Sequence, residues 1–521
     1  MLSRLAVLLT AAAGLALAVA AAPSAAAQQP NVVVIQTDDQ NSGTVTQRIM
    51  PSVVRLLGGV GTTFSDYVDS GPLCCPSRAV MLTGQYGHNN GVMWNAPNPY
   101  GDLRGKDNTL PVWLQRAGYT TAHVGKYLNE YARAVDDPNE VPPGWNEWHT
   151  AIEPDGTDTP VPYYDYTLRE NGHAVRYGSR KTDYITRQLD EKAVNLIHRY
   201  VPGTKPLFLA LDEVAPHKAP NHDPRCHGAP LPGPRDLGLF EHAPLPMSPA
   251  FNEADVSDKP SFVRALPRLT SEDVAKLQRV NGCRLAALRA VDRGVRHIYD
   301  ALRDEGALKD TAIFYTSDNG YLLGQHREQA KVVPYERSLH VPLIVRLPPE
   351  LRGPGGAPET LSSTVANVDL APTIAALAGA EPCPAAGPCR VLDGRSLLGA
   401  IRSDGRNWPR HRGIALELDG PRAAANTPCE YQGIRTSDEV YVEYRGVVPP
   451  QVGHGPCEPD DEVEHYDLQA DPFQLENIFP AAAGSPQALR ERLLATRLAR
   501  LSDCAGIKGR DPEPASGHYC E

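Results

Sequence analysis

The chain has 521 residues, 41% apolar and 22% charged, an ordinary balance for a folded protein with room for two or more domains. The net charge of −11 argues against binding nucleic acids or sulfated polymers through a general basic field. Local cations must therefore hold any anionic substrate.

The N-terminus has the features of a secretory signal peptide, which we assign to residues 1–27. Arg4 supplies the positive end, residues 5–22 form the apolar run, and three alanines at 25–27 provide a small-residue cleavage site. The alternative is a membrane anchor, because the run approaches spanning length. Its alanine-rich composition favours the signal peptide, and no later stretch could span a bilayer. We therefore expect a secreted protein without stable membrane insertion.

From about residue 30, apolar runs of strand type alternate with helical patterns. The expected strands are 32–35, 120–124, 207–211, 312–315 and 342–345, and the expected helices are 51–57, 110–116, 184–201 and 271–305. Such alternation predicts an α/β fold with a mostly parallel sheet flanked by helices. A stretch at 217–262, rich in Pro, Gly and Asp, is too long for a simple connector, and we expect it to line the mouth of the site.

The pattern changes near residue 400. Short strands are expected at 414–418, 433–436 and 440–444, and a packing helix at 490–501. We therefore divide the mature chain into a catalytic α/β domain, residues 28–400, and a smaller C-terminal α+β domain with an antiparallel sheet, residues 401–521.

Cysteine usage indicates an oxidising destination. Apart from the doublet at 74 and 75, the chain has eight cysteines. Joining sequence neighbours gives the pairs 226–283, 383–389, 429–457 and 504–520, one choice among many that eight cysteines allow. None of the eight shows the C-x-x-C spacing of a structural zinc site.

Acidic pairs follow two of the predicted strands. Asp38-Asp39 comes after the strand at 32–35, and Asp318-Asn319 comes after the strand at 312–315. Each pair alone is typical of a solvated turn. Because ligands collect at the carboxyl ends of parallel strands, two such pairs together favour a metal site. Three carboxylates and an amide carbonyl suit Ca²⁺, with Mg²⁺ as the alternative.

The strongest functional signal is the segment Cys74-Cys75-Pro76-Ser77-Arg78, followed by Thr83-Gly84. It resembles the signature C-x-P-S-R-x-x-x-x-T-G of the type I sulfatases. In that family the first cysteine is oxidised before folding to formylglycine, whose hydrate is the nucleophile. The resemblance implies this role for Cys74, an alkaline-phosphatase-like fold, and a formylglycine-generating enzyme as a partner during maturation.

The resemblance to the type I sulfatases extends along most of the chain. Residues 31–40, NVVVIQTDDQ, resemble the opening strand of the family, and residues 314–324, FYTSDNGYLLG, resemble the second acidic segment. Residues 466–472 match a pattern typical of sulfatase C-terminal regions. These matches imply that the metal ligands are Asp38, Asp39, Asp318 and Asn319, together with residue 74.

The same resemblance implies the cations of the site. Arg78 lies one helical turn after Cys74, where it would orient the modified side chain. Lys126, His217 and Lys331 are weak signals individually, but they stand in contexts that supply the sulfate-gripping cations in the family. Fixed positive charge would lower the barrier. His217 or Lys331 would protonate the leaving oxygen, and a hydroxyl of the hydrate would then expel sulfate.

One position departs from the family pattern. Many sulfatases have a histidine two residues after the lysine equivalent to Lys126, where this chain has Leu128, so the base for breakdown of the sulfated intermediate is unassigned. We expect a core role for His123. Residues 125–131, GKYLNEY, and the cysteine doublet resemble the glucosamine-6-sulfatases and the extracellular heparan endosulfatases, which act on glycosaminoglycans.

The predicted function is a secreted sulfatase acting on an aryl sulfate or a 6-O-sulfated N-acetylglucosamine-type sugar. Two alternatives stay open at this point. A metal with fixed cations also suits a phosphonate or phosphodiester hydrolase on the same fold, and a dead site would leave a sulfoglycan-binding protein.

Overall fold

The structure is a computed structural model that describes residues 29–521 except 136, 138–139, 155–159, 354–357, 425–426 and 450–453. The predicted signal peptide lies outside the described residues. Within the described part, no helix combines the length and the apolar character needed to cross a membrane.

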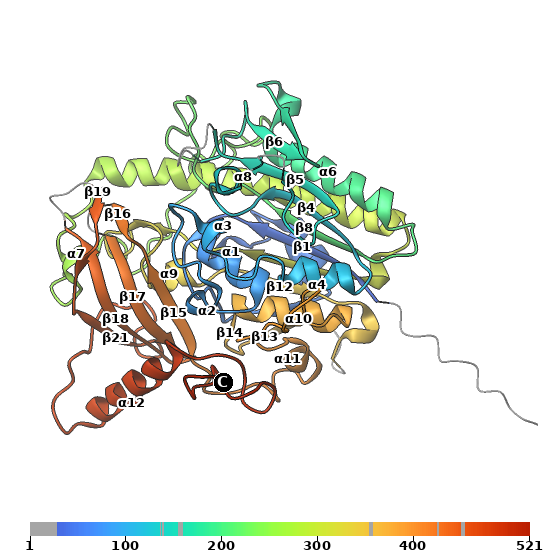
Figure 1. The fold of residues 1–521 in the computed structure, drawn as a ribbon. Helices are drawn as coiled ribbons and strands as arrows, with labels where there is room; N and C mark the ends of the chain where they lie inside the picture. Colours follow the sequence, from blue (N-terminus) through green and yellow to red (C-terminus); the bar gives the residue numbers. More distant parts are fainter. Residues whose placement is uncertain are drawn as a thin grey trace, which may run out of the picture.

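A ten-stranded sheet forms the centre of the molecule (Figure 1). Its five central strands are parallel, in the order β9 (Thr311–Ser317), β1 (Asn31–Thr37), β8 (Leu207–Asp212), β4 (Thr120–Lys126) and β5 (Glu147–Ile152). Beyond β9 lie β12 (Leu343–Arg346), β2 (Thr62–Phe64) and β13 (Glu359–Leu361), and beyond β5 lie β6 (Thr167–Glu170) and β7 (His173–Arg176). All outer pairings are antiparallel except that of β13 with β2.

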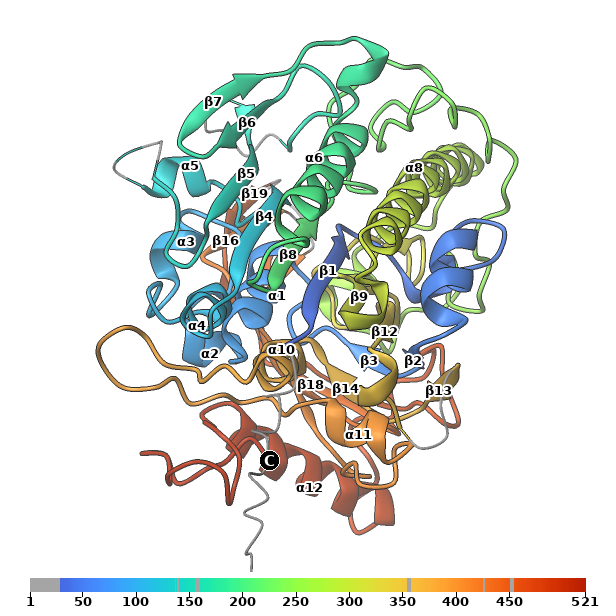
Figure 2. The same ribbon diagram turned by 90° about the vertical axis from the view of Figure 1, so that its right-hand side faces the viewer.

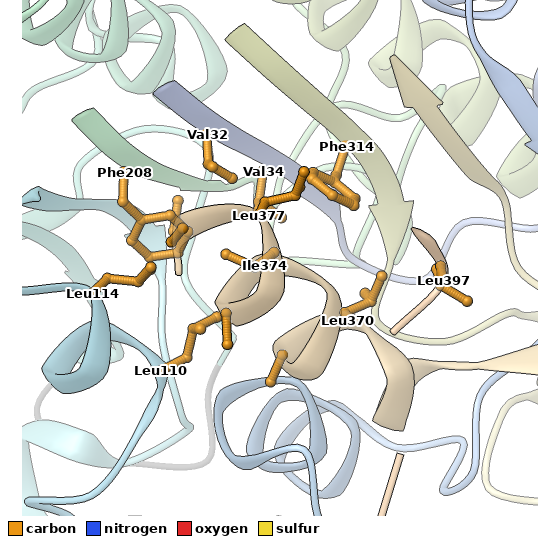
Figure 3. Packing of buried hydrophobic residues seen from close by; sticks show 14 of the residues in the cluster. Val32, Val34, Leu110, Leu114, Phe208, Phe314, Leu370, Ile374, Leu377 and Leu397 are labelled. Atoms are coloured by element: carbon orange, nitrogen blue, oxygen red, sulfur yellow. The ribbon is translucent and has the colours of Figure 1, made fainter. Parts of the chain in front are cut away.

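Helices cover both faces of this sheet because its buried strands are apolar on both sides. Val33 and Ile35 of β1 belong to a core shared with α6 (Ile185–Tyr200) and α8 (Ser271–Asp304) (Figure 2). Val32 and Val34 point to the other face, where α1 (Cys74–Thr83), α4 (Leu110–Arg116) and α10 (Leu370–Ala378) pack. Figure 3 shows this second core, in which Leu110 and Ile374 lie beneath the strands.

The predicted strands and helices of this part are present, and α4 has the predicted bounds. Thr270 caps α8 by accepting the N–H of Asp273, whose carboxylate in turn accepts the N–H of Thr270. The helix expected at 51–57 is present in another form, as a π-helix over residues Val53–Gly58. Asp292 of α8 accepts the N–H of Ser52 at 2.7 Å and of Val53 at 3.0 Å, which satisfies the beginning of that helix.

The C-terminal region forms a second, antiparallel sheet. Its strands are β15 (Ile414–Asp419), β17 (Thr427–Arg435), β18 (Glu439–Val448), β20 (Glu458–Pro459) and β21 (Val463–Asp467), and α12 (Pro486–Leu501) packs against β17 and β18. Leu416 and Ile434 share one apolar cluster with Leu73 and Val80 of the α1 region. The second sheet therefore supports the helix that begins at Cys74.

Four disulfides join the neighbouring cysteines as predicted: 226–283, 383–389, 429–457 and 504–520. Cys74 and Cys75 are free and buried. All cysteines outside the sulfatase-like segment are thus used for crosslinks.

Candidate active site

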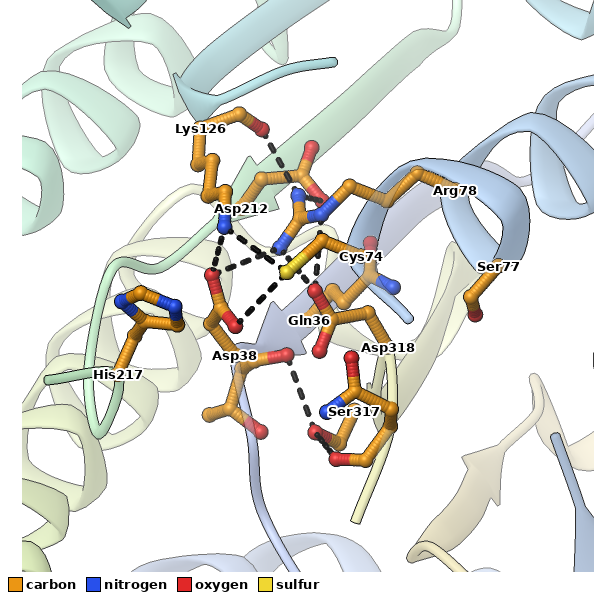
Figure 4. Close-up of polar contacts among 12 residues, drawn as sticks. Gln36, Asp38, Cys74, Ser77, Arg78, Lys126, Asp212, His217, Ser317 and Asp318 are labelled. Carbon is orange, nitrogen blue, oxygen red and sulfur yellow. Dashed lines mark hydrogen bonds and ion pairs between the residues drawn. The ribbon is translucent and has the colours of Figure 1, made fainter. Parts of the chain in front are cut away.

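Cys74 is the first residue of α1 and lies where the carboxyl ends of the central strands meet (Figure 4). Its Sγ is 3.2 Å from Nζ of Lys126, at the end of β4, and 2.9 Å from Nζ of Lys331. The thiol also faces Asp38 Oδ1 at 3.7 Å. Burial and the neighbouring Asp38 raise the pKa of the Cys74 thiol. Two ammonium groups therefore converge on the side chain of residue 74.

Arg78 lies one turn along α1, and its guanidinium points back into the same site (Figure 4). Both Nε and Nη2 are 2.9 Å from Oδ2 of Asp318, and Nη1 donates to the backbone carbonyl of Lys126 at 2.9 Å. Nη1 is also 3.4 Å from Oδ1 of Asp212. Although burial opposes it, Asp318 and Asp38 raise the pKa of Arg78. The guanidinium is thus a fixed cation that ties α1 to the ends of three strands.

Asp38 and Asp39 follow β1 and are buried, as expected. Lys126 pairs with Asp38, and Lys331 pairs with Asp39. Although burial opposes it, Lys126, His217 and Lys331 hold the pKa of Asp38 well below its usual value. Asp39 has a φ of 70°, the left-handed region that aspartate tolerates better than most residues.

Asp318 and Asn319 follow β9 and are also buried. Asp318 Oδ1 accepts the N–H of Asp39 at 3.1 Å, and Asn319 Nδ2 donates to Asp39 Oδ1 at 2.7 Å. Burial and Asp38 raise the pKa of Asp318 to about 6, against the attraction of Arg78. The two acidic segments expected to meet at the sheet edge are therefore in direct contact.

The side chains around Asp38 and Asp39 fit a hard divalent cation. Single ligand atoms of Asp38, Asp39, Cys74 and His217 all lie within 4.8 Å of one another. Asp318 is not part of that group: its Oδ2 binds Arg78, and its Oδ1 accepts the backbone N–H of Asp39. The carboxylate and amide oxygens are buried donors of the kind Ca²⁺ and Mg²⁺ prefer.

His217 follows β8 and stands beside the carboxylates, with Nε2 3.8 Å from Oδ2 of Asp39. Its Nδ1 is 2.6 Å from the carbonyl oxygen of Lys218. A carbonyl only accepts, so Nδ1 carries a hydrogen and Nε2 is the nitrogen turned toward the site. Burial lowers the pKa of His217 to about 4, against the attraction of Asp38 and Asp39.

A cavity of about 280 Å³ opens above this cluster. Asp38, Lys126 and His217 form part of its lining, and the rest includes Trp94, Asn95, Asn129, Glu130 and Glu153. Of the 217–262 stretch, only His217 and Lys218 are among the residues lining this cavity. The long irregular segment was expected to line the mouth of the site, but only its first two residues line this cavity.

Several residues of the site have contacts that the sequence analysis did not predict. Asp212, the last residue of β8, binds Arg78 and lies 3.2 Å from Nε2 of His123, which is buried as expected. Cys75 accepts the N–H of Asn129 at 3.1 Å and donates its own N–H to Asn95 at 2.8 Å. Only the position of Asp212 directly after an apolar strand could have indicated it.

Comparison with known proteins identifies the family of this chain. The sulfatase family model matches residues 30–380. The chain belongs to the sulfatase family. The resemblance inferred from the cysteine motif is confirmed, and the protein is a sulfuric ester hydrolase.

Individual sulfatases cover nearly the whole chain. An arylsulfatase of Volvox carteri is 32% identical over 528 residues, covering 94% of this chain and 77% of the relative. The N-acetylglucosamine-6-sulfatase of Homo sapiens is 31% identical over 527 residues, covering 94% of this chain and 87% of the relative. The solved structure of BT4656 in complex with its substrate D-glucosamine-2-N,6-O-disulfate has a TM-score of 0.71 at 26% identity. The match covers 90% of this chain and 97% of the solved chain. The alkaline-phosphatase-like fold is confirmed.

In this sulfatase Leu128 is buried, with 2% of its surface exposed. It belongs to the apolar core beneath the sheet, and its side chain has no titratable group. The position that carries a histidine in many sulfatases therefore serves packing here.

Proposed function

We propose that this protein is a secreted sulfatase that uses formylglycine at position 74 and a divalent metal to hydrolyse sulfate monoesters of 6-O-sulfated N-acetylglucosamine-type sugars or aryl alcohols. The observation that carries the proposal is the convergence of Lys126 and Lys331 on Cys74 beside paired carboxylates. Such an arrangement offers a nucleophile position surrounded by fixed positive charge.

The buried donor groups support a metal ion. Single ligand atoms of Asp38, Asp39, Cys74 and His217 lie within 4.8 Å of one another, and both aspartates are buried. The carboxylates of the cluster (Asp38, Asp39, Asp212 and Asp318) are matched in number by its cations (Arg78, Lys126, Lys331 and Arg284, which donates to the Asp39 carbonyl). A divalent ion held by Asp38, Asp39, Asp318 and Asn319 would make the cluster net positive toward a sulfate ester, and it would lower the pKa of an oxygen on residue 74.

Different side chains would take different roles in sulfuryl transfer. Formylglycine at position 74, when hydrated, would supply the oxygen that displaces the sugar oxygen from sulfur, and its second hydroxyl would give up a proton as sulfate leaves and the aldehyde is restored. Lys126 and Lys331 lie at residue 74, where they would hold the sulfuryl oxygens as negative charge develops. The leaving oxygen takes a proton from Lys331, or from His217 at a pH low enough to protonate its Nε2. Because attraction to Asp39 raises the pKa of Lys331, its ammonium is charged before the reaction, although burial opposes this.

The substrate class and the location are inferred from other features. The N-acetylglucosamine-6-sulfatase of Homo sapiens aligns over 94% of this chain, and the GKYLNEY segment contains residues that line the cavity. Four disulfides agree with maturation in an oxidising compartment after removal of the signal peptide. We further propose a formylglycine-generating enzyme as maturation partner, and a boundary between the catalytic and C-terminal domains near residue 400.

The proposal is tested by comparing turnover of an aryl sulfate and N-acetylglucosamine 6-sulfate with turnover of an aryl phosphodiester. We expect faster hydrolysis of both sulfates, and no hydrolysis by a Cys74→Ala variant produced in the same host. A preference for the phosphodiester would replace the proposal with a phosphohydrolase, and absence of all turnover by the fully converted protein would leave a binding protein.

The metal is tested by chelation. Removing divalent cations from the converted protein should abolish sulfate release and lower the melting temperature, because the buried carboxylates then lose their counterion. Adding back Ca²⁺ or Mg²⁺ separately would identify the ion. Full activity after exhaustive chelation would contradict the metal assignment.

A further inference from the structure

The substrate cavity is lined by two glutamates in addition to the sulfuryl-binding cation. Lys126 and His217 line it beside residue 74, and Glu130 and Glu153 line the same cavity. We call these two glutamates the acidic wall. Lys126, the ammonium beside residue 74 that lines the cavity, is already paired with Asp38.

The acidic wall is held in shape by the chain around it. Glu153 follows β5 directly, and its Oε2 accepts the backbone N–H of Glu130 at 3.3 Å. Glu130 is buried, has a φ of 57°, and its carboxylate lies 3.3 Å from Nη1 of Arg133. Two separate segments thus bring their carboxyl groups to the same cavity.

An aromatic ring also lines the cavity. Trp94 lines it, and a Cβ added at Gly420 would overlap the Trp94 ring. The backbone after β15 therefore packs directly against the tryptophan and fixes its position. A fixed ring beside hydrogen-bond acceptors is the usual composition of a pocket for a small polar ligand.

We propose that Glu153, supported by Glu130, determines specificity by accepting hydroxyl or amino donors of the leaving alcohol and rejecting a second anionic group beside the scissile sulfate. This inference rests on the proposed function. The preferred substrates are then singly sulfated hexosamines, with a free or acetylated amine, rather than hexosamines that also carry N-sulfate.

The physical reason is the chemistry of carboxyl oxygens. They accept hydrogen bonds from O–H and N–H groups, and an N-sulfate presents its own oxygens instead. In a cavity partly removed from water, two like charges several ångströms apart repel enough to lower affinity about tenfold or more. Lys218 at the rim has an exposed side chain, so water and salt screen its attraction for an anion.

The test compares kcat/KM for N-acetylglucosamine 6-sulfate, glucosamine 6-sulfate and glucosamine 2-N,6-O-disulfate, using the converted full-length protein. We expect the disulfate to have a kcat/KM about tenfold lower than either monosulfate. In a Glu153→Gln variant, this discrimination should shrink about tenfold, mainly through KM for the disulfate. The matched control is Glu272→Gln, an exposed glutamate at the beginning of α8, which should leave all three values unchanged.

The outcomes separate this inference from the proposed function. Equal kcat/KM for mono- and disulfated sugars in the unmodified protein overturns the acidic wall while the sulfatase assignment stands. Discrimination that survives Glu153→Gln also overturns it, because the glutamate would not be its source. Absence of hydrolysis of all three sugars and of an aryl sulfate overturns both.

Discussion

Replacing Arg78 by lysine tests whether fixed geometry, rather than charge alone, organises the site. The guanidinium makes two contacts of 2.9 Å with Asp318, one of 2.9 Å with the Lys126 carbonyl, and one of 3.4 Å with Asp212. Lysine keeps the positive charge but offers a single nitrogen, which cannot reach all three partners at once.

The size of the effect follows from the hydrogen bonds that a lysine cannot make. At least two charge-assisted hydrogen bonds disappear, each contributing about 1.5 kcal/mol, so the loss is about 3 kcal/mol. If this loss appears in the transition state, kcat/KM falls about 150-fold. Because Arg78 is 4% exposed, water cannot easily replace the missing donors.

The assay is sulfate release from N-acetylglucosamine 6-sulfate, normalised to the fraction of residue 74 that is converted. The control is Arg303→Lys on α8, whose side chain is 51% exposed and should tolerate the change. A thermal melt separates lost activity from lost folding. Activity of Arg78→Lys within about threefold of the unmodified protein would refute the reasoning, since it would show that charge alone suffices.

Other substitutions test the two lysines, a half-buried glutamate and the second cysteine of the doublet. Lys126→Met and Lys331→Met should each reduce kcat/KM about 100-fold or more, because each ammonium contacts residue 74. Normal kcat/KM in a folded and converted variant would show that the substituted lysine does not take part in catalysis. Glu328→Gln should raise the melting temperature at pH 8 but not at pH 4. Burial raises the pKa of Glu328 to about 8 in the folded protein. The wild-type protein therefore loses stability as the pH rises from the pKa of an unfolded Glu toward about 8, because only the unfolded state releases the proton in that range. A difference in melting temperature between variant and wild type that does not depend on pH would contradict this. Cys75→Ala should raise KM for a sugar sulfate more than for a small aryl sulfate, because the thiol holds the backbone of Asn129 at the cavity, and Cys75→Ser should restore binding.

The sequence allowed prediction of those site residues whose position depends on local pattern. Asp38 and Asp318 were expected at the sheet edge because each follows an apolar run long enough for a buried strand, and the two segments do meet. Cysteine neighbours also predicted the four disulfides. These features are encoded within short stretches of the chain.

Other features depend on contacts between distant segments, which a single sequence does not reveal. Glu153 and Glu130 meet only after β5 and the segment after β4 are brought together. The strand expected at 342–345 is present as β12, but its antiparallel pairing with β9 follows from the route of the chain rather than from its composition. The π-helix after Pro51 likewise depends on Asp292, far along the chain.

The central claim is that residue 74, once converted, is the nucleophile. The most direct measurement prepares the protein with graded conversion of Cys74 to formylglycine, determines the converted fraction from the mass of the peptide containing Cys74 and Arg78, and measures sulfate release from each preparation. The account predicts a rate proportional to the converted fraction, reaching zero when residue 74 is entirely cysteine. A rate that does not depend on conversion would contradict it.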